Sequence, residues 1–262
     1  MVRQAYTEWV GRAGGGLIFA GLALAAASNT SAQAPVAAMP APLVVLVDTG
    51  TEMPMAGFRD GQLVDGIHHD LGIALAQKLG RQAIFTPLPR KRIVMALEAG
   101  QADLICMYLP AWLPGKFQWT HGFYPVSEVV VTDTTARQPR DLRDLSGQPV
   151  ATVLGYYYPE FEQALGSGFV RDDGPSSSSN LRKMAAGRLH HAITQRDTLD
   201  YFQKIGGSLS VHPPLLVKTY MAKCAVAEQG HVKLAEVDKA ISRLVKDGDL
   251  TRIIGAYQSR LK

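Results

Sequence analysis

Short apolar runs alternate with helical patterns along most of the chain. Residues 43–47, 82–86 and 103–108 are largely apolar and rich in branched side chains, which is typical of buried strands. Between them, residues 70–79 and 90–99 place their apolar side chains on one helical face, and a glycine follows each helix. This order predicts parallel strands joined by right-handed crossovers.

The same order recurs in the second half of the chain. Residues 149–154, 168–171 and 189–194 have the character of strands, and residues 158–165 and 180–186 have the character of helices. The pattern therefore predicts an α/β protein with two similar lobes.

Two further helices are expected at residues 233–246 and 250–257. Because the second lobe is already complete before them, we assign these helices to the first lobe.

An apolar run of eleven residues, 17–27, lies near the N-terminus. It is too short to span a bilayer, and an Ala-x-Ala pattern that ends at residue 34 follows it. The pattern predicts a cleavable export signal over residues 1–34, with a buried core helix as the alternative. Residues 35–42 then form a proline-containing linker, and the mature protein is expected to be soluble and periplasmic.

Composition excludes several classes of protein. The net charge is only +4, and the one tight basic cluster is residues 90–92, so nucleic acid is not an expected partner. Hydrophobic residues make up 47% of the chain, which excludes a disordered protein.

The cysteines and histidines do not predict a metal site or a cofactor. Cys106 and Cys224 are not in a CxxC pair, and the two adjacent histidine pairs (68–69 and 190–191) cannot chelate one ion together because neighbouring side chains point apart. The periplasm permits a disulfide between the cysteines, but bridges between neighbouring strands are uncommon, which favours free thiols.

Five segments, in the same order, resemble a known family, the periplasmic solute-binding proteins of the amino-acid-binding type (extracellular solute-binding family 3). The resemblance covers almost the whole mature chain. The segments are residues 60–71 (DGQLVDGIHHDL), 97–103 (LEAGQAD), 119–124 (WTHGFY), 144–150 (DLSGQPV) and 246–253 (KDGDLTRI).

The resemblance implies a type II periplasmic-binding-protein fold, in which two βαβ lobes are joined by two crossing strands. The first lobe would take in residues 43–125 and 220–262, and the second lobe residues 133–210. The crossing strands would be residues 126–132 and 211–219. The resemblance also implies a monomer that passes its ligand to the membrane permease of an ABC transporter.

Two positions depart from the family pattern. The arginine that grips a ligand carboxylate in the family would fall just before Lys116, where there is no arginine, so Lys116 is the nearest cation. The aspartate that pairs with a ligand amine falls at Gln195. The resemblance therefore does not imply an ordinary α-amino acid as the ligand.

Candidate binding residues follow the predicted strands of the first lobe, because ligands of open α/β sheets bind outside the carboxyl ends of the strands. Arg90 can fork onto a carboxylate, with a solvated helix start as the alternative. Tyr108 and Trp112 can wall a pocket, although Trp112 can equally pack beneath its own loop. Asp48 and Glu52 lie in the first loop. They can cap turns, contact a ligand amine or act as acid–base groups.

In the second lobe, Tyr156 and Tyr157 stand at a turn before a helix and can offer hydroxyl groups. Consecutive residues point in different directions, so not every tyrosine of this run is expected to face a ligand.

The sequence thus predicts a binding protein for a small polar or anionic metabolite, either amino-acid-like or a carboxylate. One alternative is a periplasmic lyase or dehydratase on the same fold that uses Glu52 or Asp48 as a base. Another is a ligand-sensing input to a signalling receptor. The chain shows neither a nucleophile–base pair nor a cofactor motif, so no catalytic residue is assigned.

Overall fold

The computed structural model describes residues 40–258 of the 262-residue chain. The predicted export signal and most of the predicted linker lie outside the described residues. Over the part that is described, no helix combines the length and apolar character needed to cross a bilayer. All of the described residues belong to one compact unit.

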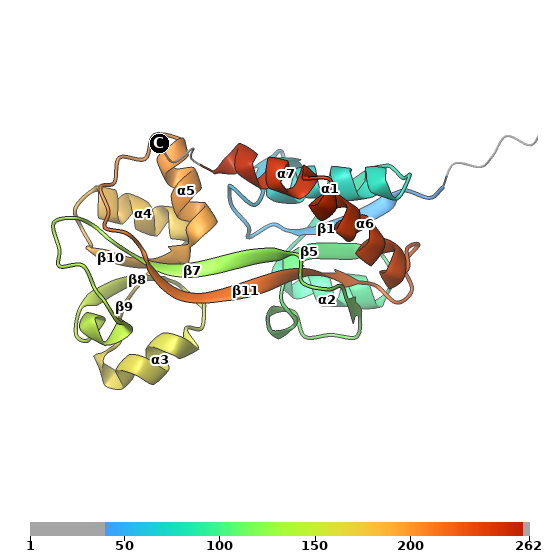
Figure 1. The fold of residues 1–262 in the computed structure, drawn as a ribbon. Helices are drawn as coiled ribbons and strands as arrows, with labels where there is room; N and C mark the ends of the chain where they lie inside the picture. The colour runs from blue at the N-terminus through green and yellow to red at the C-terminus, as the bar shows by residue number, and fades with distance from the viewer. Residues whose placement is uncertain (1–39, 259–262) are drawn as a thin grey trace, which may run out of the picture. The chain divides into compact units, whose positions relative to one another are not determined.

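The first lobe is built on parallel strands covered by helices on both faces (Figure 1). Its parallel strands lie in the order β4 (Ala83–Leu88), β1 (Leu43–Asp48) and β5 (Leu104–Tyr108). The short strand β6 (Gln118–Trp119) and a separate hairpin of β2 (Gly57–Arg59) and β3 (Gln62–Asp65) complete its strands. Its helices are α1 (Ile67–Lys78), α2 (Arg90–Glu98), α6 (Leu234–Lys246) and α7 (Asp249–Tyr257), with a 3₁₀ turn, η1, at Pro110–Trp112.

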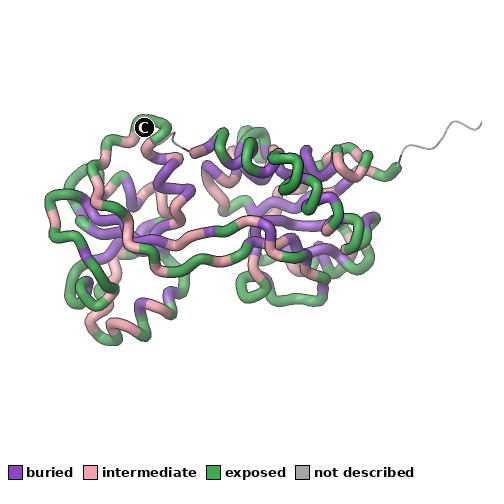
Figure 2. Tube along the Cα trace, in the orientation of Figure 1, coloured by how far each residue is buried: buried purple, intermediate pink, exposed green. Residues whose placement is uncertain are grey.

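Two layers of apolar side chains stabilise this lobe. Between the sheet and helices α1, α6 and α7, residues such as Leu71 and Ile241 are almost completely buried. On the opposite face, α2 packs Ile93 and Leu97 against the sheet. Each fully buried aliphatic side chain of this kind contributes about 1.5–3 kcal/mol. Figure 2 shows the result as strands buried along nearly their whole length.

The second lobe repeats the architecture with a core of its own. Helices α4 and α5 pack on one face of its sheet and α3 on the other. Its strands are β7 (Tyr124–Thr132), β10 (His191–Gln195), β8 (Pro149–Val153) and β9 (Val170–Gly174), and its helices are α3 (Pro159–Leu165), α4 (Ser177–Ala185) and α5 (Arg196–Lys204), with 3₁₀ turns η2 (Leu142–Leu145) and η3 (Gly166–Gly168).

Two long antiparallel strands connect the lobes. Strand β11 (Leu215–Val226) pairs with β7 from Leu215 opposite Val130 to Ala222 opposite Tyr124, and then continues along β5. Figure 1 shows β7 and β11 running side by side between the lobes. The predicted two-lobed α/β fold with two crossing strands is confirmed.

Several elements differ from the sequence-based expectation. Strand β4 runs through Pro87, which was expected to end it; β4 lies at the edge of the sheet, where a residue without a backbone N–H is tolerated. Helix α5 and the β2–β3 hairpin were not predicted. Strands β2 and β3 are only three and four residues long, too short for a clear alternation of apolar and polar residues. Helix α5 is nine residues long and carries only Leu199, Tyr201 and Phe202 as apolar side chains.

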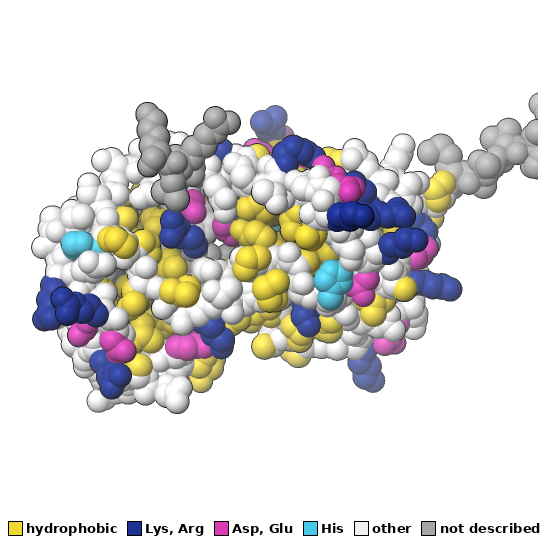
Figure 3. Space-filling view, in the orientation of Figure 1, with side chains coloured by type: hydrophobic (Ala, Val, Ile, Leu, Met, Phe, Trp, Pro, Cys, Tyr) yellow, Lys and Arg dark blue, Asp and Glu magenta, His cyan; other side chains and the backbone are white. Residues whose placement is uncertain are grey.

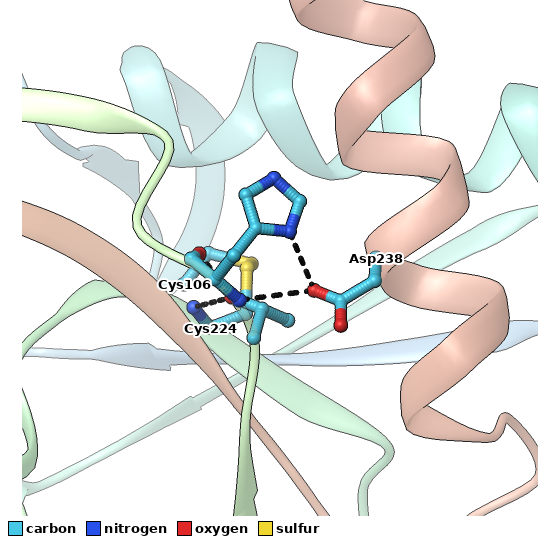
Figure 4. Close-up of a disulfide and its surroundings, with 5 residues drawn as sticks. Cys106, Cys224 and Asp238 are labelled. Carbon is cyan, nitrogen blue, oxygen red and sulfur yellow. Dashed lines mark hydrogen bonds and ion pairs between the residues drawn. A yellow bond between two sulfur atoms is a disulfide. The ribbon is translucent and has the colours of Figure 1, made fainter.

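The expectation of free cysteines is wrong, because Cys106 on β5 and Cys224 on β11 form a disulfide (Figure 4). The two strands are antiparallel neighbours, and their register shifts between Lys223 and Ala225. Two residues of β5, Cys106 and Met107, lie between the same paired positions as Cys224 alone on β11, and Met107 has φ 63°. The extra residue is therefore on β5, and such an irregularity re-aims the side chains around it. The sequence does not reveal a bulge, so the general rarity of bridges between neighbouring strands was misleading.

Candidate functional site

Three polar side chains meet where the strands of the first lobe end. Asp48 closes β1, Tyr108 closes β5, and Arg90 begins α2. Nη1 of Arg90 lies 3.3 Å from Oδ2 of Asp48 and 3.0 Å from the hydroxyl oxygen of Tyr108. The Tyr108 hydroxyl in turn donates to Asp48 at 3.3 Å. The structure thus brings together three of the predicted site residues.

The Arg90 guanidinium is engaged on several sides. Its Nη2 donates to the carbonyl oxygen of Trp112 at 2.8 Å, and its central carbon lies 4.8 Å from the centre of the Tyr108 ring. Desolvation raises the pKa of Tyr108 above its ordinary value, with Arg90 opposing the shift, so the phenol is a neutral donor at neutral pH. Arg90 therefore fixes the η1 loop and neutralises Asp48, which is 7% exposed.

The indole of Trp112 faces another aromatic side chain. Its ring packs edge-on against Tyr220 of β11, with the ring centres 5.7 Å apart. Trp112 keeps 36% of its surface exposed, so it is neither a core residue nor free of neighbours. It stands between Arg90, which holds its carbonyl, and the crossing strand that carries Tyr220.

Lys116 is not brought to this group. Its backbone N–H donates to the Glu98 carboxylate at 2.7 Å, at the opposite end of α2 from Arg90. Eight residues of α-helix, about 12 Å at 1.5 Å per residue, separate the two ends. The exposed loop that carries Lys116 therefore lies beside the C-terminal end of α2.

The second lobe presents tyrosines after β8. Tyr156 and Tyr157 are 62% and 72% exposed, whereas Tyr158 is buried. Desolvation raises the pKa of the Tyr156 hydroxyl; Arg90 opposes that shift, and Asp48 and Glu52 add to it. Tyr156 is thus within electrostatic range of charged groups that belong to the first lobe.

A direct hydrogen bond joins the lobes at the first loop. Oε1 of Glu52, in the loop after β1, accepts from the backbone N–H of Ser178 in the first turn of α4 at 3.0 Å. Asp48, Glu52, Arg90 and Tyr156 are therefore gathered around one part of the boundary between the lobes, and each lobe contributes to the group.

Sequence reasoning missed a second polar group on the crossing strands. Glu128 of β7 lies opposite both Gln195 of β10 and Lys218 of β11 in the strand register. Lys218 pairs with Glu160 of α3 at 2.6 Å, and its ammonium lies 5.0 Å from the centre of the Tyr220 ring. One signal was present in the sequence, since Glu128 is the only charged residue in the run 124–132.

Burial changes the acidity of Glu128. Desolvation, reinforced by the negative charge of Glu160, raises the pKa of Glu128 to about 7, and Lys218 opposes the shift. Gln195, the predicted site residue beside it, ends β10 and precedes the first residue of α5. Gln195 thus lies next to a carboxylate that titrates near neutral pH.

A third interlobe contact lies near the end of the described chain. The hydroxyl of Tyr124 lies 2.9 Å from Oδ1 of Asp197 in α5, and Nε2 of Gln258, just after α7, donates to the same oxygen at 3.1 Å. Desolvation raises the pKa of Asp197. This contact ties α5 of the second lobe to the end of α7 in the first.

The side chains at the boundary suit binding by hydrogen bonds, charge and aromatic contact. Between residues 40 and 258, no group of three or more histidine, cysteine, aspartate or glutamate side chains is arranged to hold a metal ion. Acidic and basic side chains are interspersed over the face drawn in Figure 3, without one broad patch of either sign.

The comparisons with known proteins agree with this geometry. The sequence model of the bacterial extracellular solute-binding proteins, family 3, matches residues 43–259. No curated protein matches the chain in sequence.

Several solved structures share the fold. An ancestral amino-acid-binding protein, described as a precursor of cyclohexadienyl dehydratase, is 18% identical with a TM-score of 0.64, and the match covers 83% of this chain and 95% of that one. The second substrate-binding domain of a putative amino acid ABC transporter from Streptococcus pneumoniae is 18% identical with a TM-score of 0.62, over 83% of this chain and 100% of that one. A periplasmic domain of BvgS from Bordetella pertussis is 17% identical with a TM-score of 0.66, over 84% and 94% of the two chains.

Proposed function

Because the chain belongs to the bacterial extracellular solute-binding proteins of family 3, we propose that it captures a small polar, amino-acid-like metabolite in a cleft between its lobes and delivers it to an ABC-type permease. The observation that carries this proposal is the bond between Glu52 and the Ser178 amide, which joins the candidate groups of the two lobes. A solute held there touches both lobes, and it favours the closed form through the contacts that it gains on closure.

The chemistry of the boundary supports a polar ligand. Tyr156 and Trp112 offer aromatic faces and hydrogen-bonding groups, and Glu52 offers a carboxylate. A carboxylate ligand at Arg90 shares the guanidinium with Asp48, which already pairs with it. A polar ligand without a carboxylate needs no such sharing.

The periplasm is the compartment that fits the proposal. The family is extracellular, and the Cys106–Cys224 bridge persists in an oxidising compartment. The export signal predicted for residues 1–34, which lie outside the described residues, would direct the chain to the periplasm.

A solute-binding role is favoured over catalysis by the state of the two candidate bases. Asp48 is tied to Gly50, Arg90 and Tyr108, and Glu52 accepts from α4. The same binding chemistry also serves a sensor domain, so the permease is the partner that an interaction experiment has to test.

Native mass spectrometry of gently purified mature protein, before and after refolding, tests the proposal. A bound solute is expected as an added mass that refolding removes, and adding the identified solute back is expected to raise the melting temperature with concentration. Arg90→Ala is expected to weaken binding about 10- to 100-fold, because it removes charged hydrogen bonds that hold Asp48 and the Trp112 loop. Arg92→Ala, in the same exposed first turn of α2, is the matched control.

Two results would contradict the proposal. One is a protein that carries no solute and whose melting temperature does not respond to amino acids or other polar metabolites. The other is turnover of the added solute that Glu52→Gln abolishes without loss of binding, which would indicate an enzyme.

A further inference from the structure

The loop that carries Glu52 is fixed to the first lobe. The Glu52 carbonyl accepts from the backbone N–H groups of Met55 and Ala56 at 3.0 and 3.2 Å, and the Thr51 N–H donates to the carbonyl of Asp48 at 3.0 Å. These turns hold the backbone of Glu52 beside the end of β1. The Glu52 side chain, however, accepts a hydrogen bond from Ser178, which is 126 positions away in the other lobe.

The first turn of α4 offers backbone N–H groups to the Glu52 carboxylate. The N–H groups of the first turn of a helix have no partner within the helix, and the helix dipole favours negative charge at this end. Ser176 caps the N–H of Ser179 at 3.2 Å, and the first turn of α4 contains no acidic residue. The Glu52 carboxylate therefore caps the N–H of Ser178 and supplies the charge that α4 itself lacks.

The neighbouring cation does not compete for Glu52. Arg90 is paired with Asp48 and bonded to Tyr108 and the Trp112 carbonyl. A solute that comes to this part of the boundary therefore finds a carboxylate on the end of α4. A carboxylate attracts cations and repels a second carboxylate.

We propose that Glu52 is a built-in anion, which caps helix α4 across the lobes and selects neutral or cationic solutes that bring no carboxylate to this end of the site. The inference rests on the proposed binding function for its ligand class, whereas the cap itself is a property of the protein without ligand. In this arrangement the solute places its amine or guanidinium against Glu52, and the α4 end stays occupied by the protein.

The cap is tested first, without any solute, by amide hydrogen exchange of Ser178. Glu52→Ala is expected to speed exchange at Ser178 at least tenfold, because the N–H loses its acceptor. Glu52→Gln keeps an oxygen acceptor without the charge. Its exchange rate at Ser178 is expected to lie between those of the wild type and Glu52→Ala. Glu228→Gln, an exposed glutamate in the same lobe, is expected to leave exchange at Ser178 unchanged. Equal exchange at Ser178 in the wild type and in Glu52→Ala overturns the cap.

The ligand class is tested with pairs of probes that differ only in the α-carboxylate, L-arginine with agmatine and L-lysine with cadaverine. Calorimetry is expected to show tighter binding of the amines than of the amino acids to the wild type. In Glu52→Ala, that preference is expected to move at least tenfold toward the amino acids, because their carboxylate can now occupy the start of α4.

Each outcome decides between the two parts of the inference. Preference of the wild type for the amino acids, unchanged in Glu52→Ala, overturns the selection by Glu52. Failure of all four probes to bind the wild type overturns the cationic ligand class, while exchange at Ser178 still decides the cap. The failure of the binding function appears separately, as the absence of any solute by native mass spectrometry.

Discussion

Removal of the Cys106–Cys224 disulfide is expected to lower the free energy of unfolding by about 5 kcal/mol at most. The two cysteines are 118 residues apart, and the closed loop contains the whole second lobe with both crossing strands. Restricting a loop of that length in the unfolded chain costs about 16 cal/mol/K, or about 5 kcal/mol at 25 °C, and measured losses extend from about 2 to 5 kcal/mol. For a chain of this size, a loss of about 5 kcal/mol corresponds to a fall of about 10–20 °C in melting temperature, and a loss of about 2 kcal/mol to a fall of about 4–8 °C.

Urea unfolding separates the cross-link from the packing of the two side chains. Both cysteines are almost completely buried, so a Cys106→Ala/Cys224→Ala variant also loses apolar contacts. Wild-type protein with the bridge reduced keeps those contacts and loses only the cross-link. We expect most of the loss in the reduced wild type, together with a steeper dependence on urea, because its unfolded chain exposes more surface.

A reduced protein whose free energy of unfolding stays within about 1 kcal/mol of that of the oxidised protein would refute this reasoning. That result would mean that the unfolded chain already holds β5 and β11 close together, so that the bridge removes little of its freedom.

Three further perturbations have expected outcomes. Because burial raises the pKa of Glu128 to about 7, its ionisation lowers the free energy of unfolding as pH rises from about 4.5 to 7. Glu128→Gln is expected to flatten this fall in the free energy of unfolding and to stabilise the protein at pH 8 by about 1–3 kcal/mol. Urea unfolding at a series of pH values measures both effects. Gly66→Ala is expected to destabilise the protein by more than about 2 kcal/mol in thermal unfolding, because Gly66 has φ 104° and a Cβ there would lie 2.7 Å from the Met55 carbonyl oxygen. Tyr257→Phe is expected to cost about 1–2 kcal/mol by the same measurement, because its hydroxyl lies 2.9 Å from Asp70 and accepts from Gly66.

The sequence predicted the repeated elements well because their apolar patterns are strong. The segments that form β1 and β5 are buried on both faces of the sheet, and strands of this kind are identified by continuous hydrophobic stretches. Helix α1 begins at Ile67 rather than near Asp70, since the chain turns at Gly66, whose positive φ is not visible in a periodic pattern. The extra residue of β5 opposite Cys224 was missed for the same reason, because local backbone geometry left no signal in residue type.

For the candidate site, the sequence identified residue types at strand ends but not their partners. Arg90, Asp48 and Tyr108 were each expected near the ligand, and the structure pairs them with one another. The Glu52 contact needed the spatial position of α4, which is 126 residues away along the chain. Glu128 was overlooked because the run around it is otherwise strand-like, and its charge is informative only once the register places it beside Gln195.

The internal pairing of these charges also determines which ligand charge is the less costly to accommodate. A ligand carboxylate that takes Arg90 away from Asp48 leaves this carboxylate, which is 7% exposed, with only the Gly50 N–H and the Tyr108 hydroxyl as donors, at a cost of up to about 3–5 kcal/mol. A ligand amine that draws the Glu52 carboxylate away from α4 leaves one N–H at a partly buried helix end, at a cost of about 1–3 kcal/mol that water can reduce. An amine that binds Glu52 without breaking the cap costs less still, because a carboxylate has a second oxygen with which to accept. These costs are the reason for the proposal that solutes approach Glu52 with positive charge rather than Arg90 with negative charge.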